Sequence, residues 1–113
     1  MSITNDEKIA IMNRTVDWLE AHPDNAIRGA MAKDAAGNHC LPFDEDAVCF
    51  CFVGRLAVEA GIHGQDTGDF KIDVEHWLSS LRASRGDLQS RNDGNPNHGQ
   101  RFRSLRSYIE QLG

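Results

Sequence analysis

The chain has 113 residues, 40% of them hydrophobic, and its 12 Lys and Arg against 17 Asp and Glu leave a formal net charge of −5. A chain of this length has room for one core and no second one, so we expect residues 1–113 to form a single domain. The negative charge disfavours nonspecific attraction to nucleic acid or anionic membranes, and the longest apolar run is far too short to span a bilayer.

The charge is unevenly distributed along the chain. Residues 1–75 carry 14 acidic and 6 basic side chains, whereas residues 76–113 carry 3 acidic and 6 basic ones. The chain has three cysteines, an odd number, and its N-terminus lacks the basic and apolar regions of a secretory signal. These features indicate a reducing compartment, so we expect a cytoplasmic protein without a disulfide framework.

The first predicted helix covers roughly residues 5–21. Thr4 and Glu7 have the spacing of a capping box, and apolar residues then recur at intervals of three and four. Pro23 removes a backbone donor and disfavours helix at the residue before it, so the chain turns there.

A short β-hairpin is expected next, between the first and second helices. The periodicity is poor from residue 28 to residue 42, but Asp34-Ala35-Ala36-Gly37-Asn38 is typical of a tight turn in which Gly37 takes a positive φ. Two strands alone are marginal in water, so this hairpin must pack against the helices.

The central element is predicted to be a helix from Asp44 to Gly61. Three consecutive acids, Asp44, Glu45 and Asp46, would complement the positive end of the helix dipole, and Gly61 would supply the left-handed stop. The eight residues that follow the acids are all apolar or glycine. The first half of this helix therefore lacks a water-facing side.

One stripe of the central helix is a candidate contact surface. Arg55 and Glu59 lie one turn apart, and continuing their stripe backward at helical spacing reaches Phe52 and Val48. Either other elements cover Val48 and Phe52, or the two side chains form a surface that binds a partner.

Two further helices complete the predicted fold. The third begins after Asp69, buries one apolar face and closes at Gly86, and the last runs from about Arg101 to Leu112. Residues 87–99 are rich in turn-forming residues and predict a long, polar, exposed loop, whose ordering on binding is left open. The expected fold is mostly α, a compact four-helix domain with one short hairpin.

Three blocks of the sequence, residues 28–38, 47–54 and 91–93, together resemble a small family of uncharacterised domains found in bacterial and phage genomes. In that family an Asp-x-x-Gly turn precedes a helix with a Cys-x-x-Gly motif, here Cys51-Phe52-Val53-Gly54. An Asn-Asp pair, matched by Asn92 and Asp93, precedes the last helix. The resemblance implies an all-helical core with a hairpin and carries no known activity.

The cysteines and histidines do not predict a metal site. Cys49 and Cys51 would diverge by about 200° on a helix, so core packing is favoured over ligation, and we expect no metal and no cofactor. Cys40 beside His39 is the candidate for a reactive thiol, with His39 or His63 as its base. We expect no enzyme, and a small thiol or hydrolytic enzyme is the alternative.

Basic residues gather in the last predicted helix. Arg101, Arg103 and Arg106 would contact phosphates if the protein bound nucleic acid, which is a second alternative. The overall acidity and the lack of interleaved aromatic residues make a solvated polar face the favoured interpretation, so nucleic acid is an unlikely partner.

We therefore expect a small acidic module that acts by stoichiometric contact with another protein, whose identity the sequence leaves open. A homodimer through the apolar stripe is one form of such contact. A phage or mobile-element inhibitor of a host nucleic-acid-binding defence protein, such as a CRISPR effector, is another, with the acids imitating a phosphate array. The residues expected to contact the partner are Val48, Phe52, Arg55, Glu59, Asp44, Glu45 and Asp46.

Overall fold

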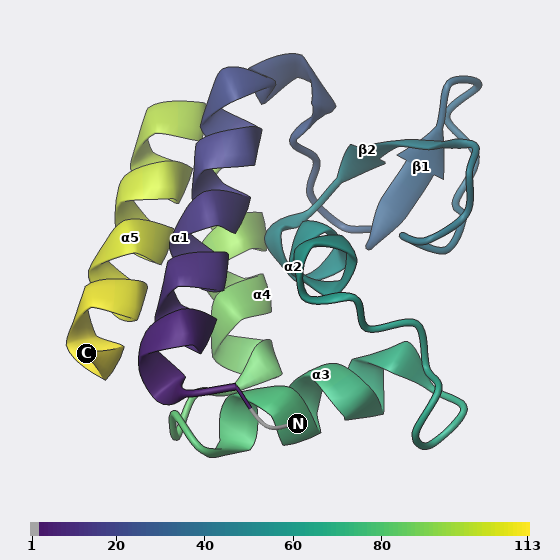
Figure 1. Ribbon diagram of the computed structural model, residues 1–113. Helices are drawn as coiled ribbons and strands as arrows, with labels where there is room; N and C mark the ends of the chain where they lie inside the picture. Colours follow the sequence, from purple (N-terminus) through teal and green to yellow (C-terminus); the bar gives the residue numbers. More distant parts are fainter. Residues whose placement is uncertain (1–2) are drawn as a thin grey trace.

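The computed structural model describes residues 3–113, which form five α-helices and a two-stranded antiparallel sheet (Figure 1). The mostly helical prediction, with one small hairpin between the first two helices, is confirmed, but the helix count is five rather than four. The helices are α1 (Asn5–Ala21), α2 (Phe52–Ala60), α3 (Phe70–Ser79), α4 (Arg85–Asp93) and α5 (His98–Leu112), and the strands are β1 (Ala32–Asp34) and β2 (Ala47–Phe50).

The core lies between the α1–α5 pair and the remaining helices. Helices α1 and α5 run side by side, and α3 crosses one end of the molecule (Figure 1). The apolar face of α1 is fully buried at Met12, Val16 and Leu19, which recur at helical spacing as predicted. Helix α2 contributes fully buried side chains to the same core, and the hairpin lies on the far side of α2 from the α1–α5 pair.

The bounds of α1 follow from local chemistry. The hydroxyl of Thr4 accepts a hydrogen bond from the backbone N–H of Glu7 at 3.1 Å, and the Glu7 carboxylate accepts one from the N–H of Thr4 at 3.2 Å. This reciprocal capping box satisfies donors that have no partner inside the helix.

None of the helices in residues 3–113 has the length and apolarity that crossing a bilayer requires.

The central helix is shorter than predicted, because residues 47–50 form β2 instead of its first turns. Strand β2 pairs with β1, with Phe50 opposite Ala32 and Cys49 opposite Lys33. Helix α2 begins only at Phe52, and Gly61 ends it in the left-handed conformation, at φ 70°, as predicted. The hydrogen bonds of the sheet thus replace those that a longer helix would have made.

Asp44, Glu45 and Asp46 consequently do not cap a helix, which corrects the predicted role of these acids. They lie in the loop that leads into β2, where the Asp44 carboxylate accepts a hydrogen bond from the N–H of Leu41 at 3.1 Å. The cap of α2 is Cys51, whose Sγ accepts from the N–H of Gly54 at 3.3 Å.

The predicted tight turn is present. Gly37 has φ 85°, and the Asp34 carboxylate accepts hydrogen bonds from the N–H groups of Ala36 and Asn38 at 3.0 and 2.9 Å. After this turn the chain makes one isolated bridge, from His39 back to Lys33, and then departs from β1. The main partner of β1 is therefore the more distant β2, with a bulge in the pairing.

The predicted loop over residues 87–99 is wrong, because its first half, residues 87–93, belongs to α4 and its last two residues belong to α5. Ser84 caps this helix, and Leu88 is fully buried in the core. Leu88 is the one apolar side chain among the nine residues of α4, so the helix has almost no periodicity to detect. Gly86, the predicted end of the third helix, lies in the first turn of α4.

Candidate functional site

The Cys-x-x-Gly motif fixes the start of α2 against the segment that precedes β1. The N–H of Cys51 donates to the carbonyl oxygen of Met31 at 3.2 Å. A Cβ added to Gly54 would lie only 1.9 Å from that same oxygen, so a glycine is needed for this close approach. Burial raises the pKa of the Cys51 thiol to about 11, so this cap is a neutral thiol at pH 7.

The Asn-Asp pair at the end of α4 connects three segments. Asn92 is 1% exposed, and its side-chain oxygen accepts from the N–H of Phe52 at 3.1 Å while its amide donates to the carbonyl of Ile27 at 3.0 Å. The Asp93 carboxylate accepts from the Asn92 amide and from the N–H of Gly29, at 2.9 and 3.1 Å. Both residues thus stabilise the junction between α2, α4 and the chain before β1.

A cavity of about 360 Å³ lies beside this junction. We call it the junction cavity. One wall is formed by the chain on either side of the tight turn, and the other by the start of α3 and the outer side of α4. The lining includes Ala30, Met31, Cys40, Leu41, Phe70 and Lys71, together with Gln89 and Asp93.

Cys40 lines this cavity, but its surroundings do not activate it. Partial burial raises the pKa of the thiol, and the neighbouring carboxylates of Asp44, Asp34 and Asp46 raise it further. A nucleophilic cysteine requires the opposite shift. Within residues 3–113 no hydrogen bond joins Cys40 to either of the proposed bases, and the ring of His63 stacks on Phe43 at a centroid distance of 5.2 Å.

The part of the chain that the structure describes contains no cluster of side chains arranged to bind a metal ion. No group of three His, Cys, Asp or Glu side chains in residues 3–113 is placed to hold a metal ion. Cys49 lies on a strand and Cys51 caps a helix, so the two are not neighbours on one helix as the sequence had suggested.

Phe52 does not belong to a contact surface, which corrects the predicted binding stripe. Its side chain is fully buried in the core. The helical spacing of the stripe is real, but α1 and α4 pack around the start of α2 and remove Phe52 from solvent. Val48 lies on β2 instead of α2 and keeps 39% of its surface exposed.

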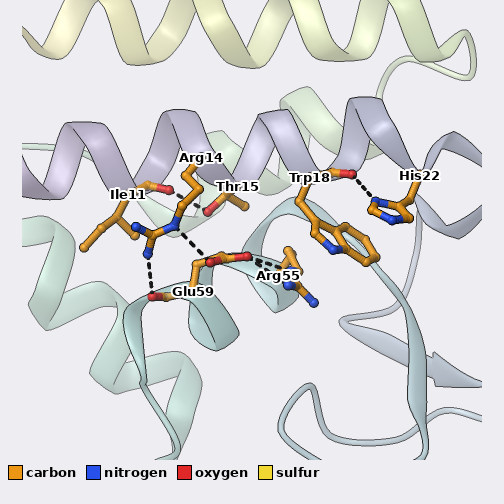
Figure 2. A network of polar contacts seen from close by, with 7 residues as sticks. All are labelled: Ile11, Arg14, Thr15, Trp18, His22, Arg55 and Glu59. Atoms are coloured by element: carbon orange, nitrogen blue, oxygen red, sulfur yellow. Dashed lines mark hydrogen bonds and ion pairs between the residues drawn. The ribbon is translucent and has the colours of Figure 1, made fainter.

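Arg55 and Glu59 form the centre of a network between α1 and α2 (Figure 2). The Glu59 carboxylate accepts from Arg55 Nη2 at 2.9 Å and from Arg14 Nε at 3.1 Å. The Arg55 guanidinium lies 4.0 Å from the centre of the Trp18 ring, whose other neighbour in Figure 2, His22, stacks on it at 4.3 Å. Arg55 and Glu59 are therefore engaged within the fold, with side chains only 18% and 15% exposed.

The exposed candidates gather on the hairpin. Leu41 and Val48 are 46% and 39% exposed, and between them the three acids of residues 44–46 are exposed too. No ion pair within residues 3–113 involves any of these acids. We call this set the hairpin surface; its members are Leu41, Asp44, Glu45, Asp46 and Val48. Sequence reasoning missed Leu41, because a lone leucine in an irregular segment has no periodic signal.

The three arginines of the alternative nucleic-acid site do not form one basic surface. Arg101 is 3% exposed and donates to the carbonyl oxygens of Asn95 and Ala26 at 3.1 and 3.2 Å. Arg106 forms ion pairs with Asp17 and Glu20 of α1, which leaves Arg103 as the exposed member of the three.

Comparison of the chain with models of protein families, with curated proteins and with solved structures finds no match. The function is therefore inferred from the geometry of the hairpin surface and the junction cavity.

Proposed function

We propose that this protein is a binding module whose hairpin surface contacts a basic surface of another protein. The observation that carries the proposal is the combination of two exposed apolar side chains, Leu41 and Val48, with three exposed carboxylates between them in the sequence that form no ion pair within residues 3–113. Apolar anchors surrounded by charge are the usual composition of protein interfaces, and the charges steer and orient the partner.

Other acids of the molecule differ from those of the hairpin surface. Asp17 and Glu20 pair with Arg106, Glu59 pairs with Arg14 and Arg55, and Glu75 pairs with Arg85. These pairs stay within the chain, whereas Asp44, Glu45 and Asp46 form no ion pair within residues 3–113 and stand next to the exposed Leu41 and Val48. A partner that supplies Lys or Arg would remove this uncompensated charge.

A basic protein is the partner that this charge selects. Nucleic-acid-binding proteins carry such surfaces, and the hairpin carboxylates would then occupy positions that phosphates normally take. A phage or mobile-element inhibitor that blocks a nucleic-acid-binding defence protein of its host needs such an acidic contact surface. We propose this function for the protein in particular. A second copy of the chain fits less well, because the arginines that gather in α5 do not form one basic surface: Arg101 and Arg106 are engaged within the fold, and Arg103 is the exposed one.

The test compares three immobilised proteins: the wild type, a hairpin variant and a charge-matched control, all checked for the same circular dichroism spectrum. The hairpin variant carries Asp44→Asn, Glu45→Gln and Asp46→Asn. The matched control carries Asp24→Asn, Asp66→Asn and Glu110→Gln, three exposed acids outside the hairpin surface, so that both variants lose three negative charges.

Each protein is exposed to the same bacterial extract, and retained proteins are quantified by mass spectrometry. We expect a basic protein that the wild type and the control retain and the hairpin variant loses, in a complex whose mass by light scattering corresponds to fixed stoichiometry. Equal retention by all three proteins would show that the hairpin surface is not the contact, and the proposal would be abandoned.

A further inference from the structure

The junction cavity opens directly beside the hairpin surface. Leu41 belongs to both, since it lines the cavity and is also the most exposed large apolar side chain of residues 3–113. A partner seated on the hairpin surface would therefore cover the mouth of the cavity. The volume of about 360 Å³ is at the small end of ligand sites and suits one large side chain together with its backbone.

Ala30 lines the cavity, and its backbone supplies a donor and an acceptor that have no partner within residues 3–113. Neither its N–H nor its C=O makes a hydrogen bond within residues 3–113. The residues on either side are held in place, because the Gly29 N–H donates to Asp93 and the Met31 carbonyl accepts from Cys51. Ala30 lies just before β1, and an extended segment can pair with such a residue by exchanging one N–H and one C=O with it.

The side chains around the cavity favour a particular segment. Met31, Leu41 and Phe70 contribute apolar side chains to a lining that also contains polar groups, and these three suit an aliphatic or aromatic side chain. The carboxylates of Asp34, Asp44 and Asp46 lie close enough to Cys40 to raise the pKa of its thiol, so negative charge lies on the hairpin side of the cavity. The cation in the lining is Lys71, which is exposed on α3 at the opposite wall and forms no ion pair within residues 3–113.

From these observations we infer that the junction cavity receives one large apolar side chain of an extended, basic segment of the partner. The main chain of that segment pairs with the free N–H and C=O of Ala30, and its basic residues face the acids of the hairpin. This inference rests on the proposed function and goes beyond it, because it names the chemistry of the segment that is bound.

The test uses blocked pentapeptides with the isotope-labelled protein, followed by nuclear magnetic resonance. One peptide has leucine between two pairs of lysines, the second has alanine in place of the leucine, and the third has leucine between two pairs of glutamates. We expect the leucine–lysine peptide to bind about tenfold or more tightly than the alanine peptide, since three more carbon groups are buried, and the glutamate peptide not to bind. The amide signal of Ala30 should shift on binding, and its hydrogen exchange should slow.

Two variants show whether the cavity itself is responsible. Ala30→Leu adds bulk to the cavity wall, whereas Ala36→Leu makes the same change at an exposed position of the tight turn. Ala30→Leu should remove the preference for leucine over alanine, and Ala36→Leu should keep it. The Ala30 amide measurement on the wild type gives the same information should Ala30→Leu fail to fold.

The outcomes separate this inference from the proposed function. Equal binding of the leucine and alanine peptides, an unchanged Ala30 amide, or no binding of any peptide would each overturn the inference. None of these results bears on capture of a partner through the hairpin acids, which is measured independently with the charge variants. Equal retention of the basic protein by the wild type, the hairpin variant and the control would instead refute the proposed function.

Discussion

Replacing Gly54 with alanine tests the close approach between α2 and the segment before β1. The added Cβ would lie 1.9 Å from the carbonyl oxygen of Met31 and 2.8 Å from its carbonyl carbon. The obstacle is backbone, so no rotation of a side chain relieves it, and the two segments must separate by about 1.5 Å to reach ordinary packing distances. That movement also strains the hydrogen bond from Cys51 N–H to the same oxygen.

The expected loss of stability follows from these contacts. Overpacking of a buried site costs about 1 to 3 kcal/mol, and the backbone position of this overlap places it near the upper end. Weakening of the buried hydrogen bond adds about 1 kcal/mol, and the better helix propensity of alanine returns about 1 kcal/mol. We therefore expect Gly54→Ala to lower the free energy of unfolding by about 3 kcal/mol.

The assay is urea unfolding followed by circular dichroism, with Gly86→Ala as the matched control. Gly86 is an exposed residue of α4, and a Cβ there would meet nothing closer than the hydroxyl oxygen of Ser84 at 3.5 Å. The same chemical change should therefore stabilise the protein at this position, by about 0.5 to 1 kcal/mol. A Gly54→Ala variant as stable as the wild type, beside a control that behaves as expected, would refute the packing argument.

Three further predictions concern the same junction. Asn92→Ala leaves the Phe52 N–H and the Ile27 C=O without their buried partner, so we expect a loss of about 2 to 3 kcal/mol in urea unfolding, and a loss below about 1 kcal/mol would contradict this role. The thiol of Cys51, whose pKa is raised from 9.0 to about 11, should contribute stability that is complete below pH 9 and falls as the pH rises to 11. Over that range the wild type should lose about 2 to 3 kcal/mol more than Cys51→Ser, and parallel pH profiles would exclude the effect. Phe52→Asp places a charge in the core and should abolish the far-ultraviolet helical signal, whereas a folded variant would mean that this position reaches solvent.

The elements that the sequence predicts well are those whose signals are local. The capping box at Thr4 and the apolar spacing after it give α1 its observed bounds, Asn5–Ala21. Asp69 caps α3 and Gly37 takes a positive φ for similarly local reasons, since each acts on backbone groups within a few residues.

Elements that depend on distant partners escape this kind of reasoning. The run from Ala47 to Phe50 is apolar enough for a helix or a strand, and pairing with β1, a segment outside this run, decides the outcome. Helix α4 has Leu88 as its single apolar anchor, and the buried amide of Asn92 supports it through bonds to residues that precede it by dozens of positions.

The candidate site divides in the same way. The exposed acids of the hairpin surface and Val48 were among the residues expected to contact a partner, although their predicted helical setting was wrong. The junction cavity was not predictable, because its walls come from residues 29–32 and 39–41, the start of α3 and the outer side of α4. The spacing of residues within one segment does not show that four separate segments meet around a cavity.

The pairing of α1 with α5 has a consequence for synthesis of the chain. The buried face of α1 packs against a helix that lies roughly 75 residues later, so at ribosomal rates that face waits about 4 to 15 s for its partner. Helix α2, which is made earlier, also packs against α1, so the part of the α1 face that α5 covers is the part that is left open longest. The ion pairs of Arg106 with Asp17 and Glu20 can therefore form only at the end of synthesis, when α5 packs on α1.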